Sequence, residues 1–430
     1  RESVVVLYGA LARHLQADDP RLLKIVDRLI ATLDTPNEDV QFAVSECLPP
    51  LVKLFEPELQ RYIEFLLNKL LTGSKYAEQR GAAYGLAGLV KGAGISALAD
   101  YDIIRTLTDA VEDRRDPKKR QGAQFAFETL SQSLGSFFEP YALEIIPLIL
   151  ASLGDTTPEV RDATTYAARQ IMKHATGYGI KQLIPLALEN LNQTAWRGKK
   201  GAVELLGTMA YLDPKQLSAS LSIIIPELVS VLNDTHREVR NAANASLKKF
   251  GEVIRNPEIQ TLVPDLIKAI GDPTQYTEKA LDGLLKTQFV HYIDGPSLAL
   301  VTHVLYRGLR DRSAGVKRKA CQIVGNMSIL TDSRDLIPYL DTLVAELEVS
   351  MVDPVPATRT TASRAIGTLV EKLGEDQLPD LIPRLLSNLK SEEKLRSFTV
   401  WVLASLMNCC PLFSKTVPVP SRLFARVSCL

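Results

Sequence analysis

The stretch from Leu143 to Met172, LEIIPLILASLGDTTPEVRDATTYAARQIM, decides the fold. It opens with an apolar run from Ile145 to Leu153 and is broken at Gly154 to Pro158. The run that follows carries apolar residues at spacings of three, four and four, namely Val160, Ala163, Ala167 and Ile171. This spacing places the four side chains on one face of a helix. The stretch therefore predicts a helical hairpin.

Three neighbouring residues mark the start of the second helix. Thr157 suits the N-cap, and Pro158 suits the first helical position, where a backbone N–H has no partner within the helix. Glu159 complements the positive end of the helix dipole. We expect the second helix to begin here.

The hairpin recurs along the chain, which matters because a lone hairpin cannot bury its apolar face. An acidic residue followed six positions later by a basic one is found in four turns: Asp155 with Arg161, Asp234 with Arg240, Asp311 with Lys317, and Asp353 with Arg359. The position of Arg161 is matched, at intervals of 38 to 42 residues, by Gln41, Arg80, Arg120, Lys200, Arg240, Lys279, Lys317 and Arg359. A period near 40 with two helices per unit is typical of HEAT repeats.

These repeats predict an all-α fold, an α-solenoid of about ten HEAT repeats that forms a curved superhelix. Residues 1–17 resemble the second helix of a unit whose first half lies upstream. The expected helix pairs are 21–55, 58–92, 101–135, 140–175, 180–211, 219–254, 258–287, 297–330 and 335–373, and a tenth begins at Asp376. Some second helices are rich in glycine, as in Arg80 to Gly88, which indicates close packing between backbones.

The expected domain organisation is one continuous array over residues 1–393, a fragment of a longer array, followed by an atypical tail over 394–430. The tail contains five basic residues and no acidic one, three of the five cysteines, and three prolines. It also lacks the small-residue pattern of a second helix. Two interpretations remain open: a truncated or wrongly joined reading frame, with the tail partly disordered, or an improvised cap with Phe398 to Met407 as its helix.

Composition and motifs argue against several functions. Lys plus Arg and Asp plus Glu number 50 each, so any contact with nucleic acid has to come from local patches. The five histidines are scattered, and no phosphate-binding loop, G-x-S-x-G or H-E-x-x-H motif occurs. We therefore expect no enzymatic activity, no metal or other cofactor, no small-molecule substrate and no membrane association. Few cysteines indicate a reducing compartment.

Basic residues gather at three turns or helix starts: Arg114 to Arg120, Arg197 to Lys200 beside Trp196, and Lys317 to Lys319. If the turns line up along one edge, these clusters form a discontinuous ridge that contacts phosphate. Within them Arg120, Lys200 and Lys317 hold the repeat position that pairs with an Asp of a neighbouring turn. Six further cations of these clusters are freer and are either partner contacts or solvated surface: Arg114, Arg115, Lys118, Lys119, Lys199 and Arg318.

Several blocks resemble the central region of the giant HEAT-repeat translational activator of general amino-acid control, which is itself similar to the HEAT domain of fungal elongation factor three. The blocks are Tyr76–Gly92, Phe138–Tyr141, Val203–Gly207, Val253–Ile259, Phe289–Asp294 and Asp353–Pro356. The resemblance covers about residues 20–393 and stops at Glu393.

This resemblance implies a cytoplasmic, non-catalytic scaffold. Members of the family lie along stalled ribosomes, contact rRNA and ribosomal proteins, bind an ABC-type ATPase, and help the starvation-sensing kinase of initiation factor two respond. The family's kinase-binding segment lies C-terminal to this region. The alternatives are a HEAT adaptor for nuclear transport or phosphatase assembly, indicated by an acidic inner face, and an elongation-factor-like ATPase, which requires a nucleotide cassette elsewhere.

Overall fold

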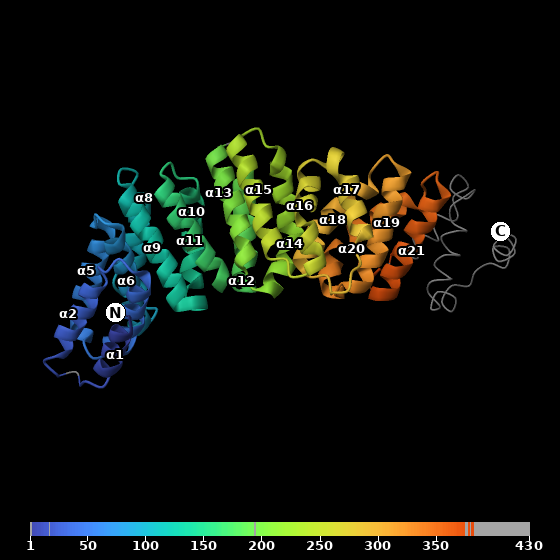
Figure 1. Cartoon of the computed structure of the whole chain (residues 1–430). Coiled ribbons are helices and arrows are strands. Elements are labelled where there is room, and N and C mark those ends of the chain that lie inside the picture. Colours follow the sequence, from blue (N-terminus) through green and yellow to red (C-terminus); the bar gives the residue numbers. More distant parts are fainter. Residues whose placement is uncertain (1, 17, 193–194, 375–376, 379, 382–430) are drawn as a thin grey trace. The chain divides into compact units, whose positions relative to one another are not determined.

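Paired helices follow one another along the chain in the computed structural model (Figure 1). The structure describes residues 2–16, 18–192, 195–374, 377–378 and 380–381. The chain divides into two compact units, one comprising Arg1–Gln216 with Asp234–Ser246 and the other Leu217–Asn233 with Leu247–Leu430. Apart from residues 377–378 and 380–381, the expected tenth helix pair lies outside the described residues, as does the atypical tail at 394–430, so both stay predictions.

The first unit begins with a lone helix and continues with helix pairs. Its helices are α1 (Glu2–Ala12), α2 (Leu22–Thr32), α3 (Glu38–Cys47), α4 (Pro49–Val52), α5 (Leu59–Thr72), α6 (Tyr76–Ala93), α7 (Ala97–Asp100), α8 (Ile103–Glu112), α9 (Pro117–Leu134), α10 (Glu139–Leu153), α11 (Pro158–His174), α12 (Gly177–Leu191), α13 (Trp196–Thr208) and the first part of α15 (Arg237–Glu252). Helix α1 packs on α3, a second helix, as expected for the second half of a repeat.

The second unit continues the same plan. It holds most of α14 (Pro214–Ser230), the end of α15, α16 (Pro257–Gly271), α17 (Pro273–Lys286), α18 (Gly295–Leu309), α19 (Ala314–Leu330), α20 (Ser333–Ser350) and α21 (Pro356–Leu373). In the described residues of this unit, the only β-type pairing is an isolated bridge between Ile293 and Thr331. The α-solenoid of HEAT repeats is therefore confirmed, whereas one continuous array over 1–393 stays a prediction.

The turn between α10 and α11 shows why the chain folds locally as a hairpin. Pro158 is the first residue of α11, as expected, and Thr157 is its N-cap residue. The N-cap position of Thr157 is confirmed, although its side chain makes no capping hydrogen bond. The Asp155 carboxylate caps the turn instead, because its Oδ1 accepts a 2.8 Å hydrogen bond from the Thr157 N–H.

Packing between repeats is close where the second helices carry glycine. Helix α6 packs on α9 and α9 on α11 in the first unit, and α19 packs on α21 in the second. A Cβ added to any of three glycines would lie 2.0 to 2.4 Å from a carbonyl oxygen of the preceding repeat: Gly81 against Leu33, Gly122 against Leu70, and Gly201 against Leu150. The close backbone packing predicted from the glycine-rich helices is confirmed.

Two stretches, Pro117–Leu153 and Pro214–Asn233, are long and apolar enough to span a membrane by length and composition. The first consists of α9 and α10, which the turn at Gly135 separates, and both helices pack against other repeat helices of the first unit. Helices that pack against other helices of a repeat array are apolar because their contact faces are buried. The expectation of no membrane association stays a prediction.

Candidate partner-binding surface

A ladder of polar side chains runs through the turns, and its members share one helical position. In eight repeats the fourth residue of the second helix is glutamine, lysine or arginine. These residues are Gln41, Gln79, Arg120, Arg161, Lys199, Arg240, Lys317 and Arg359. A side chain at this position lies over the first turn of its own helix, beside the loop that precedes it. The ladder side chains can therefore form hydrogen bonds with their own turn and with the turn of the next repeat.

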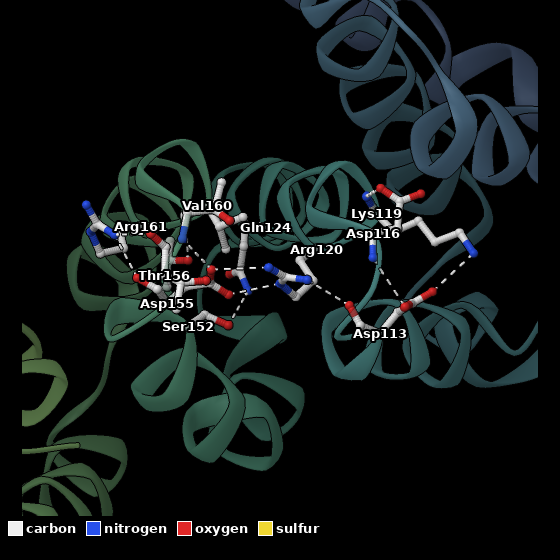
Figure 2. A network of polar contacts seen from close by, with 12 residues as sticks. Asp113, Asp116, Lys119, Arg120, Gln124, Ser152, Asp155, Thr156, Val160 and Arg161 are labelled. Carbon is white, nitrogen blue, oxygen red and sulfur yellow. Dashed lines mark hydrogen bonds and ion pairs between the residues drawn. The ribbon is translucent and has the colours of Figure 1, made fainter. Parts of the chain in front are cut away.

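The pair of Arg120 and Asp155 shows the geometry most fully (Figure 2). Arg120 Nη1 donates to the Asp113 carbonyl of its own turn at 2.8 Å. Its Nε and Nη2 donate to the Asp155 carboxylate of the next turn at 2.9 and 3.2 Å. Burial raises the pKa of Asp155, but the hydrogen bonds from Arg120 and Thr157 outweigh it, so the pKa lies below its ordinary value.

The same arrangement recurs in other turns. Lys199 Nζ lies 2.9 Å from Asp234 Oδ2, and Lys317 Nζ lies 2.9 Å from Asp353 Oδ2. The other arginines of the ladder donate from Nη1 to main-chain carbonyls of their own turns at 2.7 to 3.0 Å: Arg161, Arg240 and Arg359. In the first repeats the side-chain amides of Gln41 and Gln79 donate to carbonyls of their own and the next repeat.

The structure corrects the expected register at two turns. Lys199, grouped by sequence with the free cations, occupies the ladder position, and Lys200 instead lies 3.5 Å from Glu238 and 3.8 Å from Glu204. Gln79 likewise occupies the position that the period assigned to Arg80. Both differences have one cause: α6 and α13 each begin 38 residues after the preceding second helix, whereas the sequence assignment used intervals of 39.

The ladder is interrupted in the second unit. The fourth residue of α17 is Tyr276, and Lys279, which the period singled out, lies 3.4 Å from Asp265. Asp311 Oδ1 accepts a 2.7 Å hydrogen bond from the Ser313 N–H, and no ion pair joins it to another described residue. Asp311 therefore caps its own turn without bridging two repeats.

This interruption allows a matched stability prediction. Asp353→Ala should lower the free energy of unfolding by about 1 to 3 kcal/mol more than Asp311→Ala, because each aspartate caps its own turn but only Asp353 also accepts from a lysine of another repeat. Urea unfolding followed by circular dichroism measures the difference. Equal losses would contradict a stabilising role for the inter-repeat bond.

The difference in unfolding free energy between Asp353→Ala and Asp311→Ala should also depend on pH. Burial raises the pKa of Asp353, but Lys317 and the Val355 N–H together lower it below the ordinary value of 3.8. A lowered folded-state pKa contributes stability above the ordinary value, and that contribution is lost as the pH falls through the folded-state pKa. We expect the difference in unfolding free energy between the two variants to become smaller below about pH 4.

The basic residues outside the ladder divide into exposed and paired ones. Arg114 and Arg115 are exposed in the turn between α8 and α9, and Arg318 is exposed on α19 in the second unit. Lys118 is exposed, with its Nζ 3.1 Å from the Ser74 carbonyl oxygen, whereas Lys119 pairs with Asp113 at 3.3 Å. A ridge that joins all three basic clusters stays a prediction.

A groove of about 990 Å³ lies beside these turns in the first unit. Arg114, Arg120 and Arg197 line it together with Glu112 and Asp155. Since Arg120 is paired with Asp155, the two exposed arginines face one exposed carboxylate, and the groove keeps a positive charge. It is the kind of concave, cationic site that binds a phosphate backbone.

Arg197 was not singled out from the sequence, although it stands in a basic cluster beside Trp196. Its guanidinium lies over the Trp196 indole, with 4.6 Å between guanidinium carbon and ring centroid. The same indole stacks on the His236 imidazole at 4.1 Å with an interplanar angle of 6°. The stack holds Arg197 near the groove at a lower cost in side-chain entropy than a free arginine would have. The aromatic neighbour was the signal available in the sequence.

Paired helices, a period near 40 residues and an inter-repeat ladder define this chain as a HEAT-repeat solenoid protein. Two family models match it: "EF3 N-terminal HEAT repeat" over residues 79–247 and "Elongation factor 3/GNC1 HEAT repeat" over residues 274–380. The chain belongs to the HEAT-repeat family that elongation factor 3 and GCN1 share.

Its relatives place it within the GCN1 branch of that family. It is 62% identical to the eIF-2-alpha kinase activator GCN1 of Saccharomyces cerevisiae, over 92% of this chain and 15% of the relative. It is 46% identical to the stalled ribosome sensor GCN1 of Homo sapiens, over 91% of this chain and 15% of the relative. Elongation factor 3 of Gonapodya prolifera is 30% identical over 66% of this chain and 26% of that protein. The chain thus spans about 15% of the length of its GCN1 relatives.

Proposed function

We propose that this chain is the elongation-factor-three-like part of a ribosome-binding scaffold that promotes activation of the kinase of initiation factor two. The high identity to proteins named as a kinase activator and a stalled ribosome sensor supports this function. The location is cytoplasmic, and an ABC-type ATPase is a further partner. The alternative of an adaptor for nuclear transport or phosphatase assembly finds no support in the names of these relatives.

The observation that carries the ribosome contact is the cationic groove of the first unit. The exposed Arg114 lines it, and Arg197 is held at its wall by the aromatic stack. Arg115 is a further exposed cation of the turn that carries Arg114. Arginine donates hydrogen bonds to phosphate oxygens from a planar, permanently charged group, so its charge does not depend on the pH. The site therefore suits the sugar-phosphate backbone of rRNA.

The contact is tested by co-sedimentation of the whole chain with purified ribosomes at low and moderate salt. The combined substitutions Arg114→Glu and Arg197→Glu should weaken binding by about tenfold or more, because they place two negative charges beside phosphate. The control carries Arg105→Glu and Lys181→Glu, which alter the total charge equally at exposed positions on α8 and α12. Equal losses in both variants would contradict a specific contact at the groove.

A pull-down with the partner ATPase distinguishes a contact with rRNA from a contact with protein. If the groove variant binds ribosomes normally but no longer retains the ATPase in a pull-down, the groove is a protein-docking site and the rRNA contact lies elsewhere. If both interactions persist, the proposed surface is wrong.

A further inference from the structure

A second groove, of about 640 Å³, lies in the first unit along the second helices α6, α9 and α11. It shares no lining residue with the cationic groove. Its lining includes three tyrosines, three glutamates and one aspartate, and the function proposed above does not use it. Its charges decide what it can bind.

The floor of this groove is neutral because its cation is already paired. Arg80 is buried and donates to the Glu128 carboxylate from Nη1 and Nη2 at 2.5 and 2.8 Å. Its guanidinium also lies between the rings of Tyr84 and Phe125, 5.3 and 5.1 Å from their centroids. Its Nε is buried without an acceptor among the described residues. An anionic ligand therefore finds no free positive charge at the floor.

Two carboxylates on the walls lack basic partners. Glu159 and Asp162 are exposed at the start of α11, and no ion pair joins either to another described residue. Glu38 is half exposed, lies 3.5 Å from Arg80 Nη2 and accepts a 3.1 Å hydrogen bond from the Tyr76 hydroxyl. Of the remaining basic groups, Arg169 is stacked 4.2 Å from the Tyr211 ring, which leaves Lys173 as the exposed cation. Negative charge is thus in excess on the walls.

Exposed aromatic rings stand among these carboxylates. Tyr76 and Tyr166 are each 56% exposed, so both rings are accessible to a ligand in the groove. Tyr166 lies one helical turn beyond Asp162 on the same helix, so ring and carboxylate share one face. A ring face beside a carboxylate attracts an ammonium or guanidinium group by two effects at once.

We propose that this groove binds a basic, extended segment of a partner protein, with a lysine or arginine side chain received between Tyr166 and the carboxylates of Glu159 and Asp162. Charge complementarity selects this occupant, since the same carboxylates repel RNA. The proposal goes beyond ribosome binding, because it adds a protein-binding site of opposite charge to the same unit.

The test uses the whole chain and a fluorescein-labelled nonapeptide of alternating lysine and alanine, followed by fluorescence anisotropy. The variant Glu159→Gln with Asp162→Asn should bind the peptide about three- to tenfold more weakly, and Tyr166→Ala about two- to fivefold. The control is Asp109→Asn with Glu144→Gln, which removes two exposed carboxylates from the first helices α8 and α10. Circular dichroism establishes that each variant is folded.

The proposal is overturned if the peptide does not bind the unaltered chain, or if the control variant weakens binding as much as the groove variant. It is also overturned if the groove variant changes self-association in sedimentation velocity and leaves peptide binding intact, because the occupant is then a second copy of the chain. The groove variant should still sediment with ribosomes. Failure of one proposal is thereby distinguished from failure of the other.

Discussion

Glu128→Ala should lower the free energy of unfolding of the first unit by about 3 kcal/mol, because it leaves the buried guanidinium of Arg80 without its main partner. The two side chains are only 6% and 7% exposed, so water cannot replace the lost carboxylate. Glu38, 3.5 Å from Arg80 and half exposed, offsets part of the loss. Urea unfolding, with hydrogen exchange of the α6 and α9 amides, measures the effect.

Two further variants separate this explanation from a general effect of losing a carboxylate. Glu46→Ala removes the exposed partner of Lys91 and should cost less than about 1 kcal/mol. Arg80→Met together with Glu128→Leu removes both buried charges and should recover most of the lost stability. If Glu46→Ala and Glu128→Ala cost the same, the buried pair does not stabilise the contact between α6 and α9 as we infer.

Gly122→Ala should destabilise the first unit by about 2 to 3 kcal/mol, because the new Cβ would lie 2.4 Å from the Leu70 carbonyl oxygen. A main-chain atom cannot rotate away as a side chain can, so α5 and α9 have to separate. The better helix propensity of alanine, about 1 kcal/mol, offsets only part of this cost. Thermal and urea unfolding measure the change.

A glycine in a comparable part of a second helix serves as the control. Gly315 is the second residue of α19, and a Cβ added there would meet only the Ser313 hydroxyl oxygen, at 3.6 Å. Gly315→Ala should alter stability by no more than about 0.5 kcal/mol. A small effect of Gly122→Ala as well would show that neighbouring repeats tolerate wider spacing than this packing indicates.

The repeat architecture was predictable from the sequence because each hairpin repeats the same apolar spacing and turn chemistry. Its register was less predictable, since the period located Arg80 and Lys200 one residue beyond the true ladder positions. The period is an average of the spacing between repeats. The ladder position, in contrast, is the fourth residue of each second helix and depends on where that helix begins. The start of a helix depends on the local turn, and Lys75 and Ala195 carry no side-chain acceptor that marks an N-cap in the sequence.

The two grooves could not be predicted, because each is assembled from residues of several repeats. Arg114 and Arg197 are 83 positions apart in the sequence and line one cavity. Likewise, the pairing of Arg80 with Glu128 and not with a turn aspartate depends on how α6 packs against α9. The sequence identified the exposed cations Arg114 and Arg115, yet whether a cation is exposed or paired was decided by tertiary contacts.

The central claim, that the cationic groove binds an RNA backbone, is tested most directly by the salt dependence of binding to a purified rRNA fragment. The slope of log binding constant against log salt concentration reports the number of phosphates contacted. We expect Arg114→Ala and Arg197→Ala each to reduce the magnitude of the slope by about 1, and Arg105→Ala to leave it unchanged. Identical slopes for all four proteins would contradict the account, because the groove would then contact no phosphate.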